Sequence, residues 1–129
     1  MSDYVRQNRP LLLFTPTLAD SRLQQIKRHL QQRRCELDDR AMLIGIIVKQ
    51  GQSRLDNHPI SRTYATTLRN RYAIEDAQFT AILIGKDGGE KQRLYDIPDL
   101  DAIFALIDGM PMRQDEMAQN SIDCRRQTQ

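Results

Sequence analysis

The stretch from residue 79 to residue 95 constrains the fold of this chain more than any other. Residues 79–84 are an apolar run rich in residues that favour β-strands. Residues 86–89, Lys-Asp-Gly-Gly, end that run with a dense turn signal. Residues 90–95 then return as a mixed polar and apolar strand, which is typical of a sheet edge. Because an apolar strand needs cover on both faces, we expect a β-hairpin in a sheet with helices on each side.

Two strand–helix units are predicted ahead of this hairpin. Residues 10–14 and 41–48 are short apolar runs, as in buried parallel strands. Each precedes a stretch in which apolar side chains recur at helical spacing, first Leu23, Ile26, Leu30 and Leu37, then Ile60, Tyr64, Leu68 and Tyr72. Between the units, residues 49–58 are expected to form a surface loop, and Pro59 is expected to open the second helix.

A third helix is expected after the hairpin. Pro98 and Asp99 suit its start, and Gly109 and Pro111 are expected to end it. Its buried stripe is predicted to consist of Leu100, Ile103, Phe104 and Ile107.

The resulting order, β-α-β-α-β-β-α, is that of a thioredoxin-like α/β fold, because right-handed crossovers leave few other ways to assemble it. We expect a four-stranded mixed sheet flanked by helices. The predicted domain covers residues 9–117, with a flexible lead-in at 1–8 and a disordered polar tail at 118–129.

Composition excludes several classes of function. The 129 residues carry a net charge of +2, with 5% aromatic residues and no Trp, which argues against nucleic acid binding. No apolar run approaches the roughly 20 residues needed to span a bilayer, so no membrane insertion is expected. Two histidines, far apart, predict neither a metal nor a cofactor. With no leader pattern at the start, we expect a periplasmic or exported protein if a signal peptide has been removed, and otherwise a cytoplasmic one.

The cysteines argue against ordinary thiol redox chemistry. Cys35 and Cys124 form no CxxC motif, and residues 17–22, at the start of the predicted first helix, contain no cysteine. We therefore expect two ordinary thiols whose replacement by serine leaves folding nearly intact, although a disulfide between them stays open. Arg33 and Arg34 beside Cys35 leave a second hypothesis open, an atypical thiol oxidoreductase or peroxiredoxin-like enzyme that uses Cys35.

Three stretches also resemble a known family. They are residues 9–16 (Arg-Pro-Leu-Leu-Leu-Phe-Thr-Pro), 83–89 (Leu-Ile-Gly-Lys-Asp-Gly-Gly) and 104–113 (Phe-Ala-Leu-Ile-Asp-Gly-Met-Pro-Met-Arg). Together they are similar to a thioredoxin-like family of unknown function. It occurs in bacteria as small stand-alone proteins and in vertebrate sushi-repeat and related extracellular-matrix proteins. The resemblance covers about residues 9–117 and implies a thioredoxin-like fold and an exported protein. It implies no reaction and no catalytic residues.

These observations predict a non-catalytic binding domain, in the bacterial envelope, for an unknown protein or small-molecule ligand; a homodimer stays open. The expected ligand surface lies where the first strand ends beside the hairpin strand, at Thr15, Thr17, Asp20, Ser21, Arg22, Phe79 and Thr80. The competing interpretation is that Asp20 and Ser21 only cap the helix. Two other surfaces stay open: an anion-binding group of Arg62, Arg69 and Arg71, and a partner-binding strip of Met110, Met112 and Met117.

Overall fold

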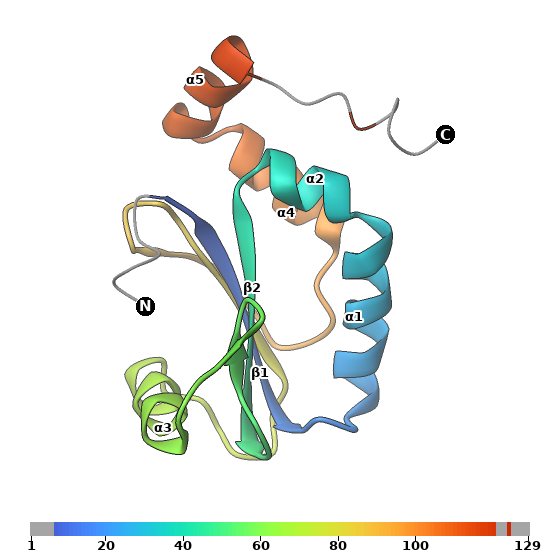
Figure 1. Ribbon diagram of the computed structural model, residues 1–129, viewed down its shortest axis with the longest axis vertical. Helices are drawn as coiled ribbons and strands as arrows, with labels where there is room; N and C mark the ends of the chain where they lie inside the picture. Colours follow the sequence, from blue (N-terminus) through green and yellow to red (C-terminus); the bar gives the residue numbers. More distant parts are fainter. Residues whose placement is uncertain (1–6, 121–123, 125–129) are drawn as a thin grey trace.

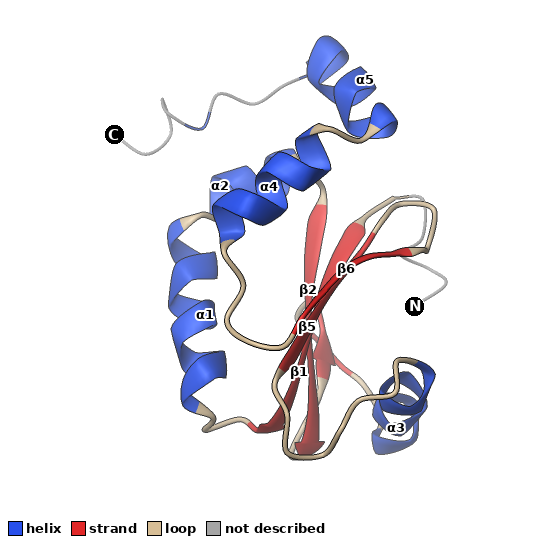
Figure 2. Cartoon of the chain, turned by 180° about the vertical axis from the view of Figure 1, so that it is seen from behind, coloured by secondary structure: helices blue, strands red, loops and turns tan. Residues whose placement is uncertain are grey.

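The computed structural model describes residues 7–120 and Cys124, and it has the expected thioredoxin-like fold. A six-stranded mixed sheet carries α1, α2 and α4 on one face and α3 on the other (Figures 1 and 2). The strands are β1 (Arg9–Thr17), β2 (Met42–Gln50), β3 (Arg54–Leu55), β4 (His58–Pro59), β5 (Thr80–Ile84) and β6 (Glu90–Leu94). The helices are α1 (Ser21–Gln32), α2 (Arg34–Asp39), α3 (Arg62–Arg71), α4 (Leu100–Asp108) and α5 (Pro111–Asn120).

Strand pairing confirms the predicted core of the sheet. β1 runs parallel to β2, with Leu11 opposite Ile44, and antiparallel to β5, with Leu12 opposite Ile82. β5 pairs antiparallel with β6 through the predicted turn. The first strand is therefore central, as the connection rules require.

Alternation along β1 divides the interior into two cores. Leu11 and Leu13 face the core that includes Leu23 and Phe104, under α1 and α4. Leu12 and Phe14 face the opposite core, which includes Leu68 of α3. Because successive side chains of a strand point to opposite faces, a run that is apolar throughout serves both layers.

The sheet has six strands rather than the predicted four, because the expected surface loop contains a short hairpin. β3 pairs with β2 and β4 pairs with β3, both antiparallel. Asp56 adopts a positive φ of 57° in the turn between β3 and β4. Pro59 consequently belongs to β4, and the expectation that it opens the second helix is wrong. Ser61 caps α3 instead, its hydroxyl oxygen accepting a hydrogen bond from the backbone N–H of Tyr64 at 3.0 Å.

The C-terminal region also differs from the expectation. The predicted stripe of α4 is confirmed, since Leu100, Ile103, Phe104 and Ile107 are all buried. Helix α4 also ends where predicted, at Asp108 with Gly109 as its C-cap, but a further helix that was not predicted follows, and Pro111 is its first residue. The first three residues of the predicted disordered tail, 118–120, belong to α5. Residues 1–6 of the predicted lead-in and most of the predicted tail lie outside the described residues.

Among the described residues, no helix combines the length and the apolar character needed to cross a membrane.

Candidate functional site

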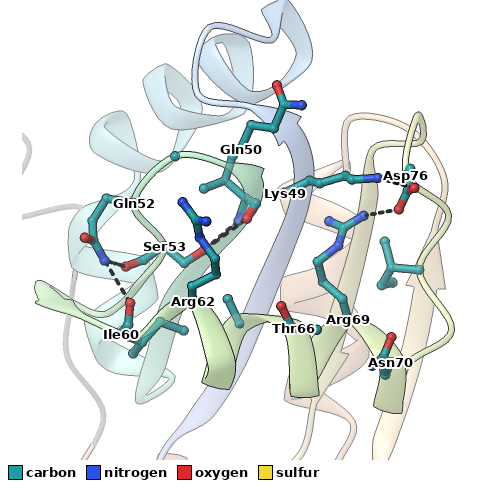
Figure 3. Close-up of a pocket in the computed structure, with 14 residues that line it drawn as sticks. Lys49, Gln50, Gln52, Ser53, Ile60, Arg62, Thr66, Arg69, Asn70 and Asp76 are labelled. Carbon is teal, nitrogen blue, oxygen red and sulfur yellow. Dashed lines mark hydrogen bonds and ion pairs between the residues drawn. The ribbon is translucent and has the colours of Figure 1, made fainter.

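A cavity of about 690 Å³ lies beside α3 at the carboxyl end of β2. Its polar lining comes from three segments: the end of β2 with the following loop, one side of α3, and the loop between α3 and β5 (Figure 3). The charged side chains of this lining are Lys49, Arg62, Arg69 and Asp76, and the amide side chains of Gln50 and Asn70 also line the cavity. Ligands of open α/β sheets commonly bind at the carboxyl ends of strands, so the position is suited to a ligand.

The loop after β2 forms a rigid wall of this cavity. Gly51 has a φ of +132°, a conformation that side chains with a Cβ rarely adopt, and it turns the chain back toward β3. The Ser53 hydroxyl then accepts a hydrogen bond from Val48 N–H at 2.8 Å. The Gln52 side-chain amide donates to the carbonyl oxygens of Ser53 and Ile60, at 3.0 and 2.8 Å. These bonds hold the loop between the end of β2 and the start of α3.

Helix α3 brings a buried arginine to the opposite wall. Arg69 shares the buried side of the helix with Ala65 and Leu68 and is only 8% exposed. Ala73, with a φ of 53°, ends the helical region, and Ile74 N–H donates to the Arg69 carbonyl oxygen at 2.9 Å. This turn directs the chain so that Asp76 lies at the cavity.

The charges in the cavity are incompletely matched. Both terminal nitrogens of Arg69 are buried and have no hydrogen-bond partner among the described residues. The nearest carboxylate is that of Asp76, whose Oδ1 lies 3.5 Å from Arg69 Nη2, within ion-pair range but too far for a good hydrogen bond. Asp76 Oδ2 pairs with Lys49 Nζ, and this hydrogen bond lowers the pKa of Asp76. With Arg62, three cations and one carboxylate line the cavity, a balance that favours an anion.

At the ligand surface predicted from the sequence, the charged groups already form hydrogen bonds with each other, unlike Arg69 in the cavity. Asp20 caps α1, accepting a hydrogen bond from Arg22 N–H at 2.9 Å. Its carboxylate also accepts from Nε and Nη2 of Arg22, at 3.0 and 2.7 Å, and these side-chain bonds lower the pKa of Asp20. The Arg22 guanidinium lies 5.6 Å from the ring centre of Phe79. Phe79 is fully buried, however, so its ring is not available to a ligand at this surface.

The remaining residues of that surface are dispersed between interior and solvent. Thr15 and Thr80 are buried, and the Thr15 hydroxyl donates to the Thr17 carbonyl oxygen at 3.0 Å. Thr17 and Ser21 are exposed. The structure therefore brings Asp20, Arg22 and Phe79 together, while the charged groups of Asp20 and Arg22 bond to each other. Ligand binding there stays a prediction, with less support than binding in the α3 cavity.

Neither the group of three arginines nor the strip of three methionines predicted from the sequence forms a single surface in the structure. Of the three arginines considered together, Arg62 and Arg69 line the cavity, whereas Arg71 is exposed and does not. Met112 is exposed, while Met110 packs against the core and Met117 is half-buried, so they form no uniform strip. No group of three or more metal-ligating His, Cys, Asp or Glu side chains occurs among the described residues.

The two cysteines form a disulfide, so the expectation of ordinary thiols is wrong. Cys35, the second residue of α2, is bonded to Cys124 with a Cα–Cα distance of 5.6 Å. Cys35 therefore presents no free thiol in this structure. Helices α2 and α3 lie at opposite ends of the molecule (Figures 1 and 2), so the disulfide is remote from the cavity.

The stretches that carry the family resemblance meet at a cluster of ion pairs beneath α5. Arg113 is 2% exposed; its Nη2 lies 2.7 Å from Asp39 Oδ2 and its Nε lies 2.9 Å from Asp108 Oδ1. Arg9 is 1% exposed, and its Nη2 lies 2.9 Å from Glu116 Oε2. Lys86 Nζ, from the hairpin turn, reaches the same Glu116 oxygen at 2.7 Å. These residues fix α5 to the rest of the domain.

Sequence reasoning missed the special position of Arg69, although a signal exists. Arg69 follows Ala65 by four residues and precedes Tyr72 by three, so it falls on the apolar stripe of α3 rather than opposite it. An arginine within an apolar stripe is the pattern that could have identified it.

Comparison with solved structures supports the fold. The chain is similar to Plasmodium yoelii thioredoxin peroxidase I, with a TM-score of 0.57, 17% identity, and coverage of 95% of this chain and 82% of that one. It is also similar to Plasmodium yoelii Prx1a, in a form modified at the N-terminus, with a TM-score of 0.55 and the same identity and coverage. At such low identity these likenesses show the fold alone.

Sequence comparison shows the family. Over 78 residues, 58% of this chain, the protein is 36% identical to coiled-coil domain-containing protein 80 of Danio rerio, and it spans 9% of that protein's length. Residues 1–116 match the family described as "Domain of unknown function (DUF4174)". The chain belongs to the DUF4174 family, with a thioredoxin-like fold.

Proposed function

We propose that this chain is a non-catalytic binding domain that holds a small anionic ligand in the cavity between α3 and the carboxyl end of β2. The observation that carries the proposal is Arg69, a buried guanidinium whose two terminal nitrogens have no hydrogen-bond partner among the described residues. A buried charge without hydrogen bonds costs free energy, so an unpartnered guanidinium in a native fold calls for a partner such as a bound anion or water.

The shape and chemistry of the cavity support the same ligand class. Binding pockets for small molecules are concave and contain a few converging polar groups. Here Arg62 and Arg69 lie about two turns apart on α3, and Lys49 comes from the end of β2 on the other side of the cavity (Figure 3). Arginine suits carboxylate and phosphate groups because its planar fork donates two parallel hydrogen bonds.

Replacing Arg69 with methionine should abolish most of the binding without harming the fold. We expect wild-type protein to bind inorganic phosphate in isothermal titration calorimetry, and Arg69→Met to weaken binding at least about tenfold, the effect of losing a charged hydrogen bond of about 1.5–3 kcal/mol. Thermal unfolding without phosphate should show equal or slightly raised stability, because a methionine fills the same space without a buried charge.

The matched control is Arg71→Met, which removes the same charge from an exposed position of α3 outside the cavity. It should leave phosphate affinity within about twofold, since exposed charges contribute little. Equal binding by wild type and Arg69→Met, or no saturable binding of phosphate by wild type, would contradict the proposed function. A large loss of stability in Arg69→Met would instead indicate a structural role for the arginine.

We also propose that the protein works in an oxidising compartment, and specifically in the bacterial envelope. The Cys35–Cys124 disulfide supports this, because disulfides persist in exported proteins and are rare in the reducing cytosol.

Thiol alkylation in intact producing cells tests the compartment. Both cysteines should resist alkylation until a reductant is added, and each should then gain one label by mass spectrometry. Protein from a cytoplasmic expression strain provides the reduced control. Free thiols in protein from its native host would contradict the proposal.

A further inference from the structure

Asp76 partly neutralises the cations that line the cavity. Its carboxylate lies between two of the cations, pairing through Oδ2 with Lys49 Nζ and through Oδ1 with Arg69 Nη2 at 3.5 Å (Figure 3). It comes from the loop after α3, and its side chain is 69% exposed. Asp76 therefore lies at the solvent side of the cavity, whereas Arg69 lies inside.

This arrangement leaves the arginine unsatisfied. The carboxylate accepts no hydrogen bond of good geometry from Arg69, and Nη1 and Nη2 remain without partners among the described residues. An oxyanion at ordinary hydrogen-bond distance, about 2.8 Å, from both nitrogens would satisfy them. Such a group would lie close to the Asp76 carboxylate, and two negative charges at that separation repel each other. Because Asp76 is largely exposed, its side chain can turn into solvent and make room.

We propose that the ligand is a small oxyanion with two negative charges, and that its acid group takes the place of the Asp76 carboxylate beside Arg69. The proposal rests on the function proposed above and specifies its ligand class. When Asp76 turns away, Lys49, Arg62 and Arg69 leave three positive charges facing the cavity, which a dianion matches better than a monoanion. Asp76 then acts as an internal competitor that lowers the apparent affinity.

Calorimetric titration of the 129-residue chain with inorganic phosphate tests this at about pH 8, where phosphate is mainly a dianion. Asp76→Asn keeps the size of the side chain and removes its charge. We expect it to bind phosphate about tenfold more tightly than wild type. The matched control is Glu75→Gln, an exposed neighbour in the same loop that does not line the cavity and should change affinity by less than about twofold.

Two further arms identify the cause of the gain. The double variant Arg69→Met/Asp76→Asn should lose the gain, because the competition takes place at Arg69. Acetate, a monoanion, should bind wild type at least about tenfold more weakly than phosphate. Comparable affinities for acetate and phosphate would overturn the dianion class.

The outcomes separate this inference from the proposed function. If wild type and Asp76→Asn bind phosphate equally, or the variant binds more weakly, the competition is wrong while anion binding stands. If Asp76→Asn binds phosphate and wild type does not, the competition by Asp76 is supported, while phosphate binding by the wild-type protein, and with it the proposed function, is contradicted. If no variant binds phosphate, both proposals fail.

Discussion

Replacing Cys35 with serine should lower the free energy of unfolding by about 4 kcal/mol. The Cys35–Cys124 bond joins residues 89 positions apart, and a cross-link over so long a loop strongly restricts the unfolded chain. The bond also ties α2 to the chain beyond α5. Urea denaturation monitored by circular dichroism measures the change, and the transition of the oxidised wild type should lie at clearly higher urea than that of the variant.

Reductant provides the control for this prediction. Dithiothreitol should destabilise wild type to the level of Cys35→Ser and should have no effect on the variant. The double variant Cys35→Ser/Cys124→Ser should match the single one, because either substitution removes the same bond. A loss of unfolding free energy below about 1 kcal/mol would contradict the prediction. It would show that the disulfide restricts the unfolded chain much less than its loop length implies.

Replacing Arg113 with alanine should cost about 3 kcal/mol, the second largest effect that we expect. Arg113 is 2% exposed and bonds to Asp108 and to both the carboxylate and the carbonyl oxygen of Asp39. Removing one partner from a buried ionic cluster is costly, because the opposite charges stay buried with fewer partners. Thermal and urea unfolding should both report the loss.

Two variants test the cause. Gln114→Ala changes the exposed neighbour of Arg113 in α5 and should change stability by less than about 0.5 kcal/mol. Arg113→Lys keeps the charge but loses the planar fork, so it should fall between alanine and wild type. An equal cost for Arg113→Lys and Arg113→Ala would assign the effect to geometry alone, and no cost for either would contradict the structural role of the cluster.

The same cluster should make stability depend on acid pH. Burial raises the pKa of Asp108, but hydrogen bonds from Arg40 and Arg113 outweigh burial and hold that pKa below its usual value. A carboxyl whose pKa is lower in the folded state stabilises the fold above its unfolded pKa, about 3.9 for Asp. That contribution is lost as the pH falls below about 4, and Arg113→Ala should lose less stability over this range than wild type.

The sequence by itself determined the central architecture. The apolar runs at 10–14, 41–48 and 79–84 are long enough to specify buried strands, and the spacing of Leu100, Ile103, Phe104 and Ile107 specifies the buried side of α4. Strand order and direction then follow, because right-handed connections restrict how these elements assemble. All of these signals are local in sequence, or depend on rules that apply to every chain.

Only the tertiary structure determined the parts that depend on distant contacts. β3 and β4 have two residues each, too few for any periodic pattern; β3 forms by pairing with the edge of β2, and β4 by pairing with β3. Helix α5 carries no buried apolar stripe. Ion pairs hold it in place instead: its Glu116 pairs with Arg9 of β1, and its Arg113 pairs with Asp39 of α2. The disulfide joins cysteines whose separation in sequence carries no information about their distance in space.

The candidate site shows the same division. The sequence placed Arg62 and Arg69 in one anion-binding group with Arg71, but it did not distinguish the exposed arginine from the buried one. Burial of Arg69 and the approach of Asp76 and Lys49 depend on how α3 packs against β2 and where the following loop returns. An unpartnered charge is a property of the assembled surroundings, because whether a guanidinium is satisfied depends on groups that only the folded chain brings within hydrogen-bond distance.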